Sequence, residues 1–135
     1  YNSDLDSWMT KAMASIYYMP EEVLEKTRDD FTESMKLAKD VFGVEAFRKI
    51  YKDHQRLPPI NKALFDVIAA QFAKLSNEQR IVILNRKNFM RAELKEMLAG
   101  DPYMFDSVTS STGDRNRVQY RHNQFIKLIF KIVEG

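Results

Sequence analysis

The polar stretch TSSTGDRNR at residues 109–117 has the residue types that bind phosphate groups. It precedes a strongly periodic apolar segment, so it lies at the amino end of a predicted helix, where backbone N–H groups lack partners within the helix. Hydroxyl groups and a flexible glycine beside such N–H groups make an anion site, and neighbouring arginines can grip a nucleic-acid backbone. The candidate nucleic-acid-binding residues in this part of the chain are Ser111, Thr112, Arg115, Arg117 and Arg121.

The distribution of charge leaves a second interpretation of these arginines open. Residues 1–46 contain five basic and ten acidic residues, a net charge of −5, whereas residues 47–135 contain sixteen basic and nine acidic residues, a net charge of +7. A basic region of this kind attracts anionic partners, but it can also pair with the acidic region of the same chain. The sequence therefore predicts either an external anion such as nucleic acid or internal ion pairs with the acidic helix.

The residue types needed for catalysis are scarce. Cysteine is absent, which excludes a disulfide, a thiol nucleophile and a zinc–thiolate site. His54 falls in a basic loop and is predicted to lie in solvent. His122 falls on an apolar stripe with no carboxylate or imidazole at helical spacing, so we predict a packed or boundary histidine. Because a glycine-rich phosphate loop and a set of inward-pointing acids are also missing, we expect no catalytic residue, no metal and no cofactor.

Hydrophobic periodicity predicts an all-α fold, a single compact domain of about six or seven helices over residues 1–135. A composition of 44% hydrophobic and 30% charged residues is typical of a folded core and excludes a disordered chain. The chain opens at Tyr1 without an initiator methionine or a signal sequence. We therefore expect it to be the carboxy-terminal part of a longer protein.

Two helices are predicted in the acidic region. The first covers residues 3–18, and a second begins at Pro20, which suits a first helical turn, and ends at Gly43. Both show apolar residues three and four positions apart, which predicts one buried face on each helix. The two predicted stripes are Leu5, Trp8, Met9, Ala12, Met13 and Ile16, and then Leu24, Phe31, Met35, Ala38 and Phe42.

The basic segment VEAFRKIYKDHQRLPP at residues 44–59 is predicted to be irregular, because its double proline disfavours helical geometry. Capping residues then place the later helices: Asn61 before residues 62–75, Ser76 with Gln79 as a capping box, and Asp101 before a brief helix. A further helix is predicted at about residues 88–98. Inward-facing residues are predicted in the short capping-box helix and in the last helix, namely Ile81, Val82 and Leu84, and then Val118, His122, Phe125, Ile129 and Ile132.

Three stretches, VFGVEAFRK (41–49), LPPINKALFDVIAAQFAKL (57–75) and FDSVTSSTGDRNRVQYRHNQFIKLI (105–129), resemble a known family in that order. They are similar to the helical carboxy-terminal region of the ParB-like domain-of-unknown-function family. That family is typified by the GmrS half of the GmrSD restriction proteins and includes phosphorothioate-sensing anti-phage proteins. The resemblance covers most of residues 41–129, and the amino-terminal helices match only as generic helix.

The resemblance implies a bacterial or phage-borne cytoplasmic protein that acts in defence against foreign DNA. It also implies that nucleotide hydrolysis belongs to an amino-terminal ParB-like domain, whose D-G-Q-Q-R-type motif does not occur here. This chain is therefore expected not to be an enzyme by itself. The positions that match the family are Arg48, Asn61, Lys62, Thr112, Asp114, Arg115 and Arg121. Three basic residues of the matched stretches, Arg48, Lys49 and Lys62, are added to the candidate nucleic-acid-binding residues.

The expected partners are DNA and the ParB-like domain of the same protein, and no membrane partner is expected, because no apolar run approaches the length of a membrane-spanning helix. An alternative function stays open. The chain can instead be a protein–protein interaction or oligomerisation module that binds no nucleic acid, with exposed apolar residues as its surface. Trp8, Tyr17, Tyr18 and Met19 are the candidates for that surface.

Overall fold

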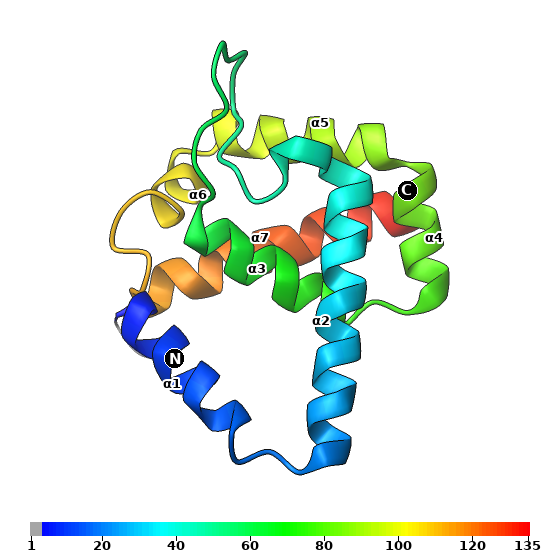
Figure 1. Ribbon diagram of the computed structural model, residues 1–135. Coiled ribbons are helices and arrows are strands. Elements are labelled where there is room, and N and C mark those ends of the chain that lie inside the picture. Colours follow the sequence, from blue (N-terminus) through cyan, green and yellow to red (C-terminus); the bar gives the residue numbers. More distant parts are fainter. Residues whose placement is uncertain (1–3) are drawn as a thin grey trace.

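The computed structural model describes residues 4–135, apart from the side chains of Leu5 and Trp8. Within these residues the chain folds into seven α-helices and one 3₁₀ helix, without a β-strand, which confirms the predicted all-α class (Figure 1). The predicted helix start at Ser3 and the predicted packing of Leu5 and Trp8 lie outside what the structure describes. In chain order the helices are α1 (Leu5–Ile16), α2 (Glu21–Phe42), η1 (the 3₁₀ helix, Gly43–Glu45), α3 (Lys62–Ala73), α4 (Asn77–Asn85), α5 (Lys87–Gly100), α6 (Pro102–Ser107) and α7 (Arg115–Glu134).

The predicted capping residues begin their helices. The Asn61 Oδ1 atom accepts from the backbone N–H of Leu64 at 2.9 Å at the start of α3. Ser76 and Gln79 form the expected capping box of α4, and Asp101 accepts from two N–H groups of α6. Each cap satisfies donors that a helix start leaves free, which stabilises the helix by about 1 kcal/mol. The last helix differs from the prediction. It begins at Arg115, within the expected loop, because Asp114 is its cap.

The core lies where the second half of α2, α3, α5 and α7 meet, and α3 occupies its centre. Phe72 of α3 is fully buried; its ring stacks on Phe42 of α2 at 6.2 Å and lies 5.8 Å from Phe125 of α7. Fully burying a side chain of this kind stabilises the fold by about 1.5–3 kcal/mol. The core therefore depends on contacts among helices that are distant in sequence.

Two burial predictions are wrong. Ile81, predicted to face inward, is 58% exposed, whereas Ile83 is fully buried. A helix of nine residues has apolar residues on more than one side, and the packing of α4 against α2 and α7 selects which side is covered. The second error concerns the predicted stripes of α1 and the first half of α2, where Met13, Ile16 and Phe31 are exposed.

These exposures follow from the path of the amino-terminal helices. Figure 1 shows α1 and the first half of α2 diverging from the helical core and meeting at the turn between them, away from α3 and α7. Only the second half of α2 is covered by the core. In the part of the chain that the structure describes, no helix combines the length and the apolarity needed to cross a membrane.

Candidate nucleic-acid interface

The basic segment predicted to be irregular forms a loop that projects from the helical core between η1 and α3 (Figure 1). An antiparallel bridge between Arg48 and Ile60 closes its base, where the backbone N–H of Asn61 donates to the carbonyl of Phe47 at 2.7 Å. The Arg48 guanidinium strengthens this closure, since it donates to the carbonyls of Val44 and Pro58. Arg48 therefore shapes the loop, and two of its donors are used inside the protein.

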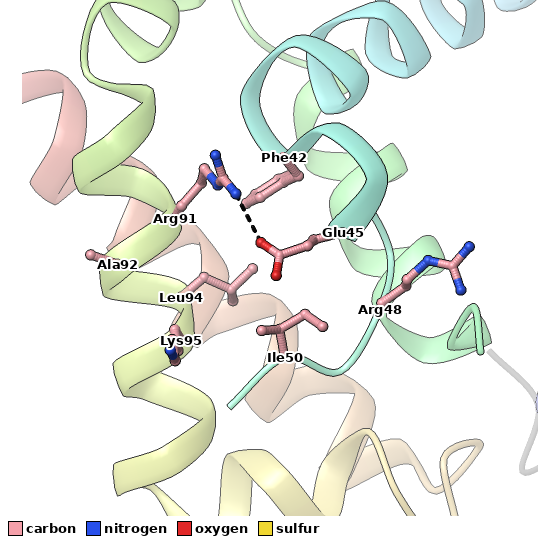
Figure 2. A pocket seen from close by; sticks show the side chains of 8 residues that line it. All are labelled: Phe42, Glu45, Arg48, Ile50, Arg91, Ala92, Leu94 and Lys95. Atoms are coloured by element: carbon pink, nitrogen blue, oxygen red, sulfur yellow. Dashed lines mark hydrogen bonds and ion pairs between the residues drawn. The ribbon is translucent and has the colours of Figure 1, made fainter. Parts of the chain in front are cut away.

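Glu45 holds the projecting loop against α5. Its carboxylate accepts from Arg91 Nη2 at 2.9 Å and contacts His54 Nε2 at 3.0 Å. Figure 2 shows Glu45 and Arg91 reaching toward each other across a pocket of about 230 Å³ whose apolar lining includes Leu94. The hydrogen bonds from His54 and then Arg91 lower the pKa of Glu45, so the carboxylate stays ionised and the clamp persists at neutral pH.

A cationic hollow of about 400 Å³ lies on the projecting loop itself. It combines positive charge with an aromatic ring. Tyr51 packs edge-on against Phe105 of α6 at 4.9 Å, and Lys49 and Lys52 lie over the rings of Phe105 and Tyr51 at 4.7 and 5.3 Å. The cationic side chains that line the hollow are those of Lys49, Lys52 and Arg56, and His54 lies beside them.

A second, polar hollow of about 510 Å³ adjoins the first, because both are lined by Ile60 and Asn61. Lys62 and the hydroxyl residues of the 109–114 loop, Ser111 and Thr112 among them, line this hollow. Asp6 of α1 also reaches it and pairs with Lys62 at 2.6 Å. The polar hollow is therefore less cationic than the hollow on the projecting loop.

Two direct contacts join these regions across 60 and 47 residues of the chain. Lys49 Nζ donates to Thr109 Oγ1 at 3.1 Å, and the Asn61 side-chain amide donates to the Val108 carbonyl at 2.7 Å. Asn61 therefore caps α3 and also anchors the polar loop. The structure thus brings together candidates from all three sequence stretches, namely Lys49, Lys62, Ser111 and Thr112.

Arg117 has an internal role. Its guanidinium donates to the Asp106 and Ser110 carbonyls, each at 2.9 Å, and to the Ser110 hydroxyl. These bonds hold the 109–114 loop in place, together with Ser111, whose φ of 48° makes the turn. Arg117 thus bonds to its own loop, not to the acidic helix α2, whereas Arg115 is exposed at the start of α7.

Arg121, one of the predicted nucleic-acid-binding residues, does not lie at the surface. Arg121 is fully buried; its guanidinium donates to the Ser107 and Thr112 carbonyls at 2.9 and 2.8 Å and lies 3.6 Å from the Asp66 carboxylate of α3. A nucleic acid at the surface cannot touch this side chain. The sequence pattern indicated this burial, because Arg121 lies between Val118 and Phe125 at the spacing of one helix face.

His122 is a half-buried boundary residue, as predicted, and its partners come from another helix. Its Nδ1 atom contacts the Gln71 amide at 3.0 Å, and its Nε2 atom lies 3.3 Å from Asp66. The histidine thus helps to hold α7 against α3. Among residues 4–135, no three carboxylate or imidazole groups converge in a way that could hold a metal ion.

Sequence reasoning omitted Lys52 and Arg56 from the binding candidates, although both lie in the basic stretch that it singled out. The exposed cations that line the two hollows are Lys52, Arg56 and Lys62, and the exposed Arg115 directly follows the polar 109–114 loop in the chain. With the hydroxyl residues of the polar loop, they define an all-α domain whose projecting loop carries positive charge. No family model, curated protein or solved structure matches this chain.

Proposed function

We propose that this chain is an accessory helical domain of a prokaryotic defence or restriction-type protein, and that it helps an amino-terminal nucleotidase domain engage DNA. The observation that carries the proposal is the junction of the cationic loop with the polar 109–114 loop at Ile60 and Asn61. The family resemblance of the same stretches supports it. The proposal assigns the chain to the cytoplasm and gives it no catalytic residue, metal or cofactor.

Phosphate contact is the chemistry that this surface would supply. Exposed lysine and arginine side chains neutralise backbone phosphates and release counterions, which gives affinity without sequence preference. Serine and threonine hydroxyls add hydrogen bonds to phosphate oxygens. Tyr51 is half-buried and its neighbours are cations, so it also offers an aromatic contact to a base or sugar.

The test is binding of the full chain to a labelled DNA duplex over a salt series. Removing three cations in Lys52→Ala/Arg56→Ala/Arg115→Ala should weaken binding at low salt and reduce the slope of log K against log salt by about 3. The matched control removes three exposed cations from α2 in Lys26→Ala/Arg28→Ala/Lys36→Ala. Equal losses of DNA affinity in the two variants would contradict a localised site, because the change in net charge alone would explain them.

The alternative function, a protein–protein interaction module without nucleic-acid binding, has support of its own in the exposed apolar residues of α1 and α2. The same titration separates the two functions. If the wild-type chain fails to bind duplex DNA at low salt, the DNA proposal falls and the interaction module becomes the better description.

A further inference from the structure

The apolar stripe of α1 begins at the core and continues past it. Met9 packs against the core cluster. Met13 and Ile16 lie one and two turns further along the same face, and they are 67% and 39% exposed. In a folded domain, neighbouring elements normally cover such an apolar stripe of a helix. In this chain the second half of the stripe of α1 faces solvent.

The first half of α2 repeats this arrangement. The ring of Phe31 lies 6.4 Å from Phe65 of α3, yet Phe31 is 50% exposed. Leu24 lies two turns earlier on the same face and is half-buried. Each stripe therefore starts at a contact with the core and continues along a helix that diverges from it, and the two helices meet at the turn between them (Figure 1).

The turn itself adds to this apolar surface. Tyr17 and Tyr18 are almost fully exposed where α1 ends. The surface of the two stripes and the turn therefore consists of Met13, Ile16, Tyr17, Tyr18, Leu24 and Phe31. We call it the amino-terminal apolar surface. Exposed and half-buried apolar side chains on two consecutive helices and the turn between them are typical of an interaction site.

Charge around this surface indicates the kind of partner. Residues 4–30 contain seven acidic and three basic residues, a net charge of −4. Two of the carboxylates already have a cation, since Asp30 pairs with Lys26 at 2.8 Å and Asp6 pairs with Lys62 of α3 at 2.6 Å. The other five acidic and two basic residues keep a net charge of −3. The same surface of a second copy would carry the same negative charge and would be repelled. A cationic partner is attracted.

We propose that the amino-terminal apolar surface binds a cationic amphipathic helix of a partner protein. The apolar face of such a helix would pack against the stripes of α1 and α2, as in other complexes of a helix with an apolar surface. Its lysine and arginine residues would meet the surrounding carboxylates. The proposal does not depend on nucleic-acid binding by the cationic loop.

The probe is a fluorescent peptide of leucine and lysine, about 18 residues or five turns long, with leucines at helical spacing. A scrambled peptide of the same composition is its control. Binding to the full chain is followed by anisotropy. The test variant is Met13→Gln/Ile16→Gln. The matched control variant, Ile81→Gln/Phe130→Gln, changes two side chains of α4 and α7 that are also about half exposed.

We expect the amphipathic peptide to bind wild-type protein and the control variant equally, and the Met13→Gln/Ile16→Gln variant at least about tenfold more weakly. Binding should also weaken as salt is added. Equal affinity for the scrambled peptide, or equal losses in the two variants, would overturn the proposal. The proposal would also be overturned if the wild-type protein sediments as a dimer and Met13→Gln/Ile16→Gln abolishes that dimer, because a second copy would then cover the surface. Circular dichroism of each variant verifies that the helices are intact.

Discussion

Replacing Arg121 by alanine should destabilise the fold strongly. The buried guanidinium donates to the carbonyls of Ser107 and Thr112 and lies beside the Asp66 carboxylate. One side chain of α7 therefore joins the end of α6, the polar loop and α3. Its truncation removes the donor of two carbonyls and takes the guanidinium away from a largely buried carboxylate, which keeps its contact with His122.

The expected loss can be derived from these contacts. A hydrogen bond with a charged donor contributes about 1.5–3 kcal/mol, and removing one partner of a buried ion pair costs about 3–5 kcal/mol. Since the two effects share one guanidinium and are not additive, we expect a loss of about 4 kcal/mol in the free energy of unfolding. That is a large part of the free energy of unfolding of a typical domain, which is roughly 5–15 kcal/mol.

The assay is urea unfolding followed by circular dichroism and extrapolated linearly to water. Arg121→Lys should give a smaller loss, because an ammonium group keeps the charge but lacks the forked donors of arginine. Arg115→Ala, at an exposed position six residues earlier, is the control and should change stability by less than about 0.5 kcal/mol. A loss below about 1 kcal/mol for Arg121→Ala would refute the reasoning, because the side chain would then behave as a surface residue.

Two further predictions concern Asn61 and Glu45. Asn61→Ala should lower the free energy of unfolding by about 2 kcal/mol, because it removes both the cap of α3 and the hydrogen bond to the Val108 carbonyl. Asn61→Ser keeps an oxygen that can cap the helix. It should therefore lose about half as much stability in the same urea assay. The pKa of Glu45 is lowered in the folded state. The ionised carboxylate therefore contributes its full stabilisation above the ordinary glutamate pKa of about 4.3. This stabilisation is lost as the pH falls through the lowered pKa. The stability difference between wild type and Glu45→Gln should therefore shrink as the solution is made acid; a difference that does not change with pH would contradict this.

Local features of the fold were predictable because local chemistry decides them. A cap needs only a side chain that can reach an N–H group two or three residues away, as with Asn61, Ser76 and Asp101. Asp114 was the exception. It caps α7 inside a stretch whose polar composition is typical of a loop, so the helix start was predicted too late.

Burial was less predictable, because it depends on which helices meet. Ile81 and Ile83 are both apolar and lie in one short helix, and only the packing of α4 against α2 and α7 leaves the first exposed. Arg121 shows the same effect on the candidate site. Its charge favoured a place at the surface, but it lies on the inward side of α7, where Asp66 and two backbone carbonyls of other segments offset its burial.

The sequence by itself determined the helical class, the caps and the position of the basic stretch, because each depends on residues close together in the chain. The tertiary structure was needed to show that Lys49 contacts Thr109 and that Asn61 contacts Val108, since these contacts join residues 60 and 47 positions apart in the chain. It also decided that the apolar stripes of α1 and α2 extend past the core. Periodicity shows that a helix has an apolar face, but the position of neighbouring helices determines whether that face is covered.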